Sequence, residues 1–226
     1  MKRFSKLFIT LLCCVGAMSL TSCLNSDDDS STIDPETYAY YLNLMGGSYT
    51  GINSDYRYQN KIYFYNDTIT GNNKTDSIMN ITGSVSSRDT TFRISNVPGR
   101  VLAKEFPNNY KSIKDAIEER SLGNIITSKF DFFQITQNAY FFPYNTTAVI
   151  DNLEYDGETH KITIAFWGGG MYSSGAFGII NGNSVLEITL CMAAVYEDDN
   201  NQPLFTFPTS SNEDLSKASL IIRVTR

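Results

Sequence analysis

Histidine is nearly absent from this sequence, because His160 is the only one among 226 residues. A metal site built on two or three imidazoles is therefore excluded, and a Ser-His-Asp arrangement would have to use this one residue. The sequence also has no Gly-x-Ser-x-Gly elbow, no Ser-x-x-Lys motif and no phosphate-binding loop. Since His160 closely follows a predicted hairpin turn, we expect it to face solvent on a strand. We predict no cofactor, no metal and no enzymatic activity.

Cysteine is also scarce, with four residues in the chain. Cys13 and Cys14 lie in an N-terminal segment that we expect to be removed, and Cys23 would carry a lipid, so Cys191 is left as the one thiol. A single cysteine forms no internal disulfide and is either reactive or a buried apolar residue. The apolar neighbours of Cys191 favour burial, because reactive thiols lie in electropositive, partly exposed surroundings.

No apolar run reaches the roughly 20 residues that a membrane-spanning helix needs. The N-terminus instead has a basic start, an apolar stretch over residues 7–20 and a cysteine at position 23. This is the architecture of a secretory signal. Its end resembles a lipobox, in which the cysteine receives acyl chains and becomes the first residue of the mature protein. We predict that residues 1–22 are a signal peptide and that the lipid on Cys23 anchors the protein in the outer membrane.

Basic residues are fewer than acidic ones, with 18 Lys plus Arg against 24 Asp plus Glu and a net charge of −6. Loss of the signal removes Lys2, Arg3 and Lys6, which leaves 15 basic residues against 24 acidic ones and a net charge of −9. Nucleic acids and anionic lipid surfaces are held by patches of Lys and Arg. Neither is therefore expected as a partner.

A serine and three aspartates, Ser26, Asp27, Asp28 and Asp29, closely follow the lipidation site. This run resembles the export signal that moves lipoproteins of certain Gram-negative anaerobes to the outer leaflet, which would expose the protein on the cell surface. The alternative is that the acidic stretch only keeps a flexible tether solvated. We assign residues 23–33 to this tether.

Tyr and Phe account for most of the aromatic residues, which make up 13% of the chain and stand among abundant Thr and Asn. This composition is typical of strands joined by polar turns. Asp34 and Pro35 predict the cap and first turn of a short helix that Gly46 ends. Helical spacing predicts a helical insertion within residues 99–123. We expect one domain over residues 34–226, mainly β (α+β), whose antiparallel sheets form a sandwich or an open barrel.

Alternating apolar residues mark the strands of the second half. Asp156 and Gly157 lie between two strand-like runs, and this pair favours a hairpin turn whose positive φ angles match the twist of the strands. The alternation over residues 162–166 recurs over 186–194 and over 220–224. A terminal strand of this pattern pairs inside a sheet, so we expect its removal to unfold the domain.

Three short segments carry a resemblance to a known family, at residues 47–51, 97–102 and 156–162. They resemble surface-exported lipoproteins of gut Gram-negative anaerobes that carry a domain of unknown function (4840-like). The resemblance extends from about residue 35 to the C-terminus. It implies the location and the fold class, and it assigns no active-site residue.

Four carboxylates, Asp151, Glu154, Asp156 and Glu158, crowd the predicted hairpin. A glycosidase needs only two carboxyl groups, about 5 to 10 Å apart, so a carbohydrate-active hydrolase stays open as an alternative. Such residues more often form a solvated turn. The acidic run at residues 197–201 lacks the alternating spacing and the glycine of a calcium loop, and we interpret it as an exposed connection.

The glycine-rich stretch at residues 167–177 is the strongest candidate binding segment. Its glycines allow close backbone approach, and Trp167 and Tyr172 could stack on a sugar face or grip a peptide. The alternative is a flexible loop whose aromatic rings pack on the sheet edge. The parity of Trp167 along the strand leaves open whether its ring is exposed.

Thr68, Ser77 and Thr90 each follow an aspartate and precede an isoleucine or a threonine. This pattern resembles the O-glycosylation site of exported proteins in these anaerobes, and we take the three as candidate sites.

The sequence favours an outer-membrane lipoprotein that binds a glycan or a surface protein without catalysis. Two other classes stay open beside it. One is the hydrolase based on carboxylates. The other is a structural or adhesion subunit, which a free, flat sheet edge at the C-terminal strand would indicate.

Overall fold

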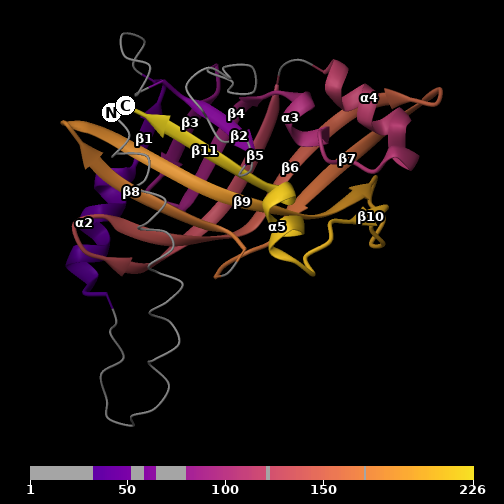
Figure 1. The fold of residues 1–226 in the computed structure, drawn as a ribbon. Coiled ribbons are helices and arrows are strands. Elements are labelled where there is room, and N and C mark those ends of the chain that lie inside the picture. The colour runs from indigo at the N-terminus through magenta and orange to yellow at the C-terminus, as the bar shows by residue number, and fades with distance from the viewer. Residues whose placement is uncertain (1–32, 52–58, 65–79, 121–122, 171) are drawn as a thin grey trace, which may run out of the picture. The chain divides into compact units, whose positions relative to one another are not determined.

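The computed structural model describes residues 33–51, 59–64, 80–120, 123–170 and 172–226 (Figure 1). The lipidation site, the export signal, Thr68 and Ser77 lie outside these residues. In the described part of the chain, no helix has the length and apolar character needed to span a membrane.

Helix α2 (Pro35–Met45) follows Asp34, whose carboxylate accepts a hydrogen bond of 2.9 Å from the backbone N–H of Thr37. This bond lowers the pKa of the Asp34 carboxyl. The helix stops at Gly46, as predicted. Its side chains contact the tip of the first long hairpin, where the Tyr41 hydroxyl donates to the carbonyl of Thr136.

Eleven strands form one antiparallel sheet within the described residues. Their order is β1-β3-β4-β5-β6-β7-β9-β11-β2, β10 pairs with β9, and β8 pairs with both β6 and β9. Their bounds are β1 (Gly47–Tyr49), β2 (Lys61–Phe64), β3 (Thr82–Ser86), β4 (Thr91–Val97), β5 (Asn124–Ile135), β6 (Ala139–Tyr155), β7 (Glu158–Phe166), β8 (Ser174–Ile180), β9 (Asn183–Glu197), β10 (Phe205–Thr206) and β11 (Ser219–Thr225).

The sheet curls on itself in two places. Strands β7 and β8 each join β6 to β9, so these four strands close a small ring. Farther along the sheet, the backbone N–H of Gly51, just after β1, donates to the carbonyl of Thr225 in β11 at 2.9 Å. The prediction of a mainly β domain with antiparallel strands in a barrel-like arrangement is confirmed.

The helical insertion is also present, as α3 (Gly99–Ala103), a 3-10 turn (Asn108–Tyr110) and α4 (Lys111–Glu119). It lies at the opposite end of the sheet from α2 (Figure 1). Gly99 allows the two helices to touch, because a Cβ atom there would be 1.6 Å from the carbonyl oxygen of Ile117. Any larger residue at this position would separate them.

Local sequence patterns also produce the hairpin and the last strand. Asp156 and Gly157 form the turn between β6 and β7 with φ angles of 52° and 88°, which match the predicted turn type. Strand β11 lies between β9 and β2, so the expected pairing of the C-terminal strand inside the sheet is confirmed. A short helix, α5 (Asn212–Ala218), precedes it.

The core fills the interior of the curled sheet. It contains a cluster of phenylalanine rings, in which Phe130 and Phe141 have centroids 5.1 Å apart. Cys191 is fully buried on β9, as predicted. Burial raises the pKa of its thiol, so the group is an inert part of the core.

Candidate ligand-binding grooves beside Trp167

Trp167 lies directly after the last residue of β7, in a loop that two backbone hydrogen bonds hold in place. The N–H of Trp167 donates to the carbonyl of Cys191 on β9, and the N–H of Gly169 donates to the carbonyl of Pro143 on β6, both at 2.8 Å. Gly169 and Gly170 have φ angles of 64° and 59°, which favour glycine. The start of the loop is therefore anchored to two strands.

The structure brings the two predicted binding residues together. The ring centroids of Trp167 and Tyr172 are 5.3 Å apart, with an angle of 34° between the planes. Tyr172 is half-buried against the core, whereas Trp167 is 40% exposed, and the preceding Phe166 points into the core. Tyr172 thus supports an indole ring that solvent can reach.

A first groove lies between β6 and the loop after β7. Its volume is about 710 Å³, and Asp131 on β5 provides its one charged side chain. The other lining residues are aromatic, hydroxyl, amide or small: Phe142, Tyr144, Asn145, Thr146, Thr147, Ala165, Phe166, Gly168 and Gly169.

A second groove lies on the other side of the same loop, toward β9 and β10. Its volume is about 680 Å³, and it shares Ala165, Phe166 and Gly168 with the first groove. Trp167 itself lines it, together with residues that are apolar or carry a hydroxyl: Ala193, Ala194, Tyr196, Thr206, Phe207, Pro208, Thr209 and Ser210. The two grooves therefore adjoin.

The chemistry of the lining suits an uncharged ligand with both apolar and hydroxyl surface. No lysine or arginine lines either groove in the described part of the chain. Among the lining residues, the exposed aromatic rings are those of Trp167 and of Tyr144, which is 38% exposed. Sites for small ligands combine mostly apolar walls with a few polar groups, and an aromatic ring with a polar rim provides both.

The one carboxylate of the first groove is already engaged. The hydroxyl of Tyr38 on α2 donates a hydrogen bond of 2.8 Å to Asp131. Burial and this bond together raise the pKa of Tyr38 to about 12, so its hydroxyl stays protonated at neutral pH. Tyr38 thus holds the carboxylate at the groove.

The carboxylates that the hydrolase alternative requires lie elsewhere. Asp151, Glu154, Asp156 and Glu158 are all exposed on the β6–β7 hairpin, and none of them lines a groove. Each groove offers at most one carboxylate, whereas the reaction needs two.

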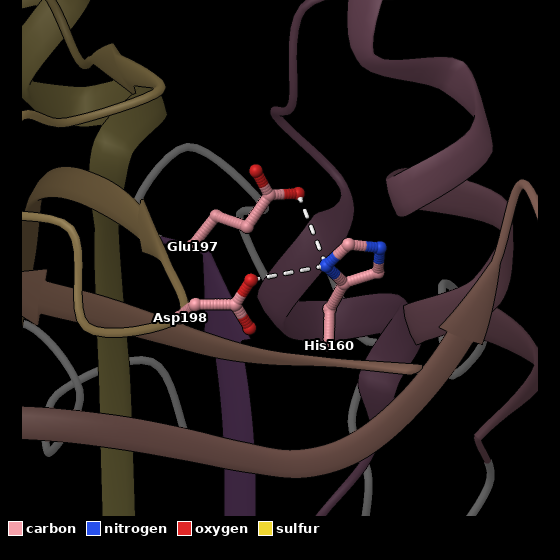
Figure 2. A group of neighbouring side chains, drawn as sticks. All are labelled: His160, Glu197 and Asp198. Carbon is pink, nitrogen blue, oxygen red and sulfur yellow. Dashed lines mark hydrogen bonds and ion pairs between the residues drawn. The ribbon is translucent and has the colours of Figure 1, made fainter. Parts of the chain in front are cut away.

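The burial of His160 contradicts the expectation that this residue faces solvent, because its side chain is only 15% exposed. Its ring stacks on Tyr155 with centroids 4.3 Å apart. Figure 2 shows the carboxylates of Glu197 and Asp198 pointing to the same ring nitrogen. Nδ1 lies 3.2 Å from an oxygen of Asp198 and 3.7 Å from an oxygen of Glu197.

Further contacts fix these carboxylates. The backbone N–H of Lys161 donates to Asp198 at 2.9 Å, and this bond and the one from His160 lower the pKa of Asp198. The start of the acidic run at residues 197–201 is therefore tied to β7 and is more than an exposed connection. The sequence held a signal for this group, because His160 has the same strand parity as the buried Ile162.

Of the three candidate glycosylation sites, only Thr90 is in the described residues. It lies in the turn between β3 and β4 with φ at 46°, and its hydroxyl donates to the carbonyl of Asp89 at 2.8 Å. The prediction of a glycan there stays a prediction.

Comparison with known proteins identifies the family of the chain. A family model described as "Domain of unknown function (DUF4840)" matches residues 44–197, which is more than half of the chain. This range contains Trp167, Tyr172 and His160, while β10 and β11 follow it. No curated protein and no solved structure matches the chain.

Proposed function

The chain belongs to the DUF4840 family, and we propose that it is a lipid-anchored surface module that binds a neutral glycan in the two grooves beside Trp167. The observation that carries this proposal is the exposed Trp167 ring, supported by Tyr172, between two adjoining grooves whose lining has no basic residue. A surface-protein ligand is the runner-up.

A pyranose ring presents an apolar face of C–H groups and a rim of hydroxyls. The face stacks on an indole or phenol ring, and the hydroxyls exchange hydrogen bonds with amide and hydroxyl side chains. Asn145 and Thr147 offer such groups in the first groove, as do Thr206 and Thr209 in the second. A chain of several sugars could extend from one groove to the other past Gly168.

The Trp167→Ala variant tests this proposal. Thermal unfolding of the purified protein against a panel of host and dietary oligosaccharides identifies a ligand, which at 100 times its dissociation constant stabilises the fold by about 2.7 kcal/mol. We expect the variant to bind that ligand at least about tenfold more weakly, because truncating a central aromatic anchor costs ~2 kcal/mol or more.

Tyr40→Ala is the matched control, since Tyr40 is 62% exposed on α2 and lines neither groove. It should bind as tightly as the unmodified protein. Equal affinity of Trp167→Ala would contradict the proposal. A panel without any stabilising glycan would favour the surface-protein ligand instead.

The anchor is a separate part of the proposal and rests on the N-terminal sequence pattern. Replacing Cys23 with alanine should remove the acceptor of the acyl chains and release the protein from the outer membrane. Fractionation of cells that express each form measures this. A variant that still sediments with the outer membrane after washing at high salt would contradict the lipid anchor.

A further inference from the structure

We propose that His160, Glu197 and Asp198 bind a divalent transition-metal ion, for which zinc is the best match. Within the described ranges, this is the group of His, Cys, Asp and Glu side chains whose potential ligand atoms all lie within 4.8 Å of one another. None of these three residues lines either groove, so the group is distinct from the proposed glycan site.

The distances within the group fit a common ion. Zinc binds imidazole nitrogen and carboxylate oxygen at about 2.0–2.2 Å, so two ligands of a tetrahedral ion lie roughly 3.4 Å apart. The observed separations from Nδ1 of His160 are 3.2 Å to Asp198 and 3.7 Å to Glu197. A small adjustment of these side chains would place all three atoms around one ion.

The donor types select the class of metal. An imidazole nitrogen with two carboxylates suits zinc and its first-row neighbours, whereas calcium and magnesium prefer oxygen ligands alone. The exposed fractions of the Glu197 and Asp198 side chains are 30% and 56%. Water can therefore complete the coordination on the open side.

Neighbouring groups hold the ligands in the way that metal sites require. The hydroxyl of Tyr155 donates to the Glu197 oxygen that faces the imidazole, and the N–H of Lys161 occupies the other oxygen of Asp198. Such outer contacts orient the ligands and raise metal affinity.

The imidazole also has a suitable orientation. Its Nε2 faces away from Glu197 and Asp198 (Figure 2). This nitrogen lies 3.9 Å from a carboxylate oxygen of Glu158. In the neutral ring that binds a metal through Nδ1, the proton sits on Nε2, and a carboxylate there favours that tautomer.

The position in the fold gives the ion a structural role. His160 is near the start of β7, Glu197 ends β9, and Asp198 begins the connection toward β10. An ion at this point would tie the connection to β7 at one end of the ring of strands, and it would stabilise the folded protein by linkage.

The single histidine makes the test selective, because ¹⁵N-labelled histidine reports on His160 alone in the full chain. Zinc chloride is added to the detergent-solubilised protein, and the imidazole resonances are followed by NMR. We expect the Nδ1 resonance to move with one equivalent of bound zinc and the proton to remain on Nε2. The thermal midpoint of unfolding should rise in parallel.

Neighbouring aspartates supply a matched pair of variants. Asp198→Asn should weaken zinc binding by more than about tenfold, while Asp199→Asn, at an exposed position that pairs with Lys161, should bind like the unmodified protein. Glu197→Gln is a second variant with the same expected loss, so misfolding of one variant leaves the proposal testable.

Two results would overturn the proposal. One is an imidazole spectrum that does not respond to millimolar zinc, which would identify the group as a hydrogen-bonded cluster that holds no metal. The other is equal zinc affinity in Asp198→Asn and Asp199→Asn.

Discussion

Replacement of Ile222 by alanine is expected to lower the free energy of unfolding by about 2–5 kcal/mol, because the change leaves a cavity in a closely packed core. Ile222 is fully buried on β11, and its backbone is paired with Ile188 on β9 and Ile62 on β2. Urea unfolding followed by circular dichroism measures the loss.

Ile179→Ala is the matched control, because Ile179 is also an isoleucine on a strand but is 53% exposed. Its effect should stay within about 0.5 kcal/mol. An equal loss of stability in the two variants would contradict the assignment of β11 to the core.

Deletion of residues 219–226 removes the whole of β11 and should therefore destabilise the domain more than Ile222→Ala does. The strand buries Leu220, Ile222 and Val224, each contributing about 1.5–3 kcal/mol, against a typical total stability of 5–15 kcal/mol. The deletion also removes Arg226, whose guanidinium donates to two carbonyls at the end of α2, those of Leu44 and Gly46. We expect an unfolded chain, and a cooperative thermal transition in the truncated protein would contradict this.

Asn60→Asp is expected to destabilise the domain by at least about 3 kcal/mol at pH 7.5. The Asn60 amide is buried, and its Nδ2 donates to the carbonyls of Tyr49 and Ile81 at 3.0 and 2.8 Å. Its Oδ1 accepts from the N–H of Thr225 at 2.8 Å. The carboxylate of aspartate would place negative charge against the two carbonyls and lose both donated bonds.

The loss should shrink as the pH falls. Burial beside two carbonyls would raise the pKa of the introduced carboxyl in the folded state above its unfolded value of about 3.9. Its neutral form is then favoured by folding, so stability relative to the unmodified protein increases as the pH drops from 7.5 toward 5. The protonated carboxyl can also donate one of the lost bonds.

Urea unfolding at both pH values, with Asn109→Asp at an exposed position as the control, measures the difference. A loss of the same size at pH 5 and pH 7.5 would show that the carboxyl does not titrate at a buried site.

Local sequence patterns were sufficient to predict those structural elements that are determined by residues close together in the chain. Asp34 with Pro35 predicted the start of α2, and Asp156 with Gly157 predicted the β6–β7 turn, because capping and turn chemistry act over two to four residues. The parity of residues 220–224 predicted a buried terminal strand. These signals required no knowledge of the partner strands.

Contacts between residues far apart in the chain could not be predicted from the sequence pattern. Asn60 bonds Thr225, 165 positions away, and nothing near Asn60 indicates that partner. The group around His160 depends on the register that sets Glu197 opposite Ile162. Strand parity indicated the side of the sheet for His160, but the proximity of the hairpin turn favoured the wrong expectation of exposure.

The candidate binding site contains both a feature that the local sequence predicted and features that depend on contacts between distant residues. The glycine-rich composition of residues 167–177 identified Trp167 and Tyr172 as candidate binding residues. The alternation of side chains along the strand could not predict whether Trp167 is exposed, because the regular strand ends at Phe166. The bond from Gly169 to Pro143 turns the loop toward β6 and leaves the indole at the surface. The grooves on each side arise from strands far apart in the sequence.

Trp167 is the only tryptophan in the chain, so its fluorescence tests the central claim without any substitution. The measurement is a titration of the protein with the panel of oligosaccharides, following emission and quenching by acrylamide. We predict that the stabilising glycan shifts the emission to shorter wavelength and protects the indole from the quencher. A glycan that stabilises the protein against heat and leaves both signals unchanged would contradict binding at Trp167.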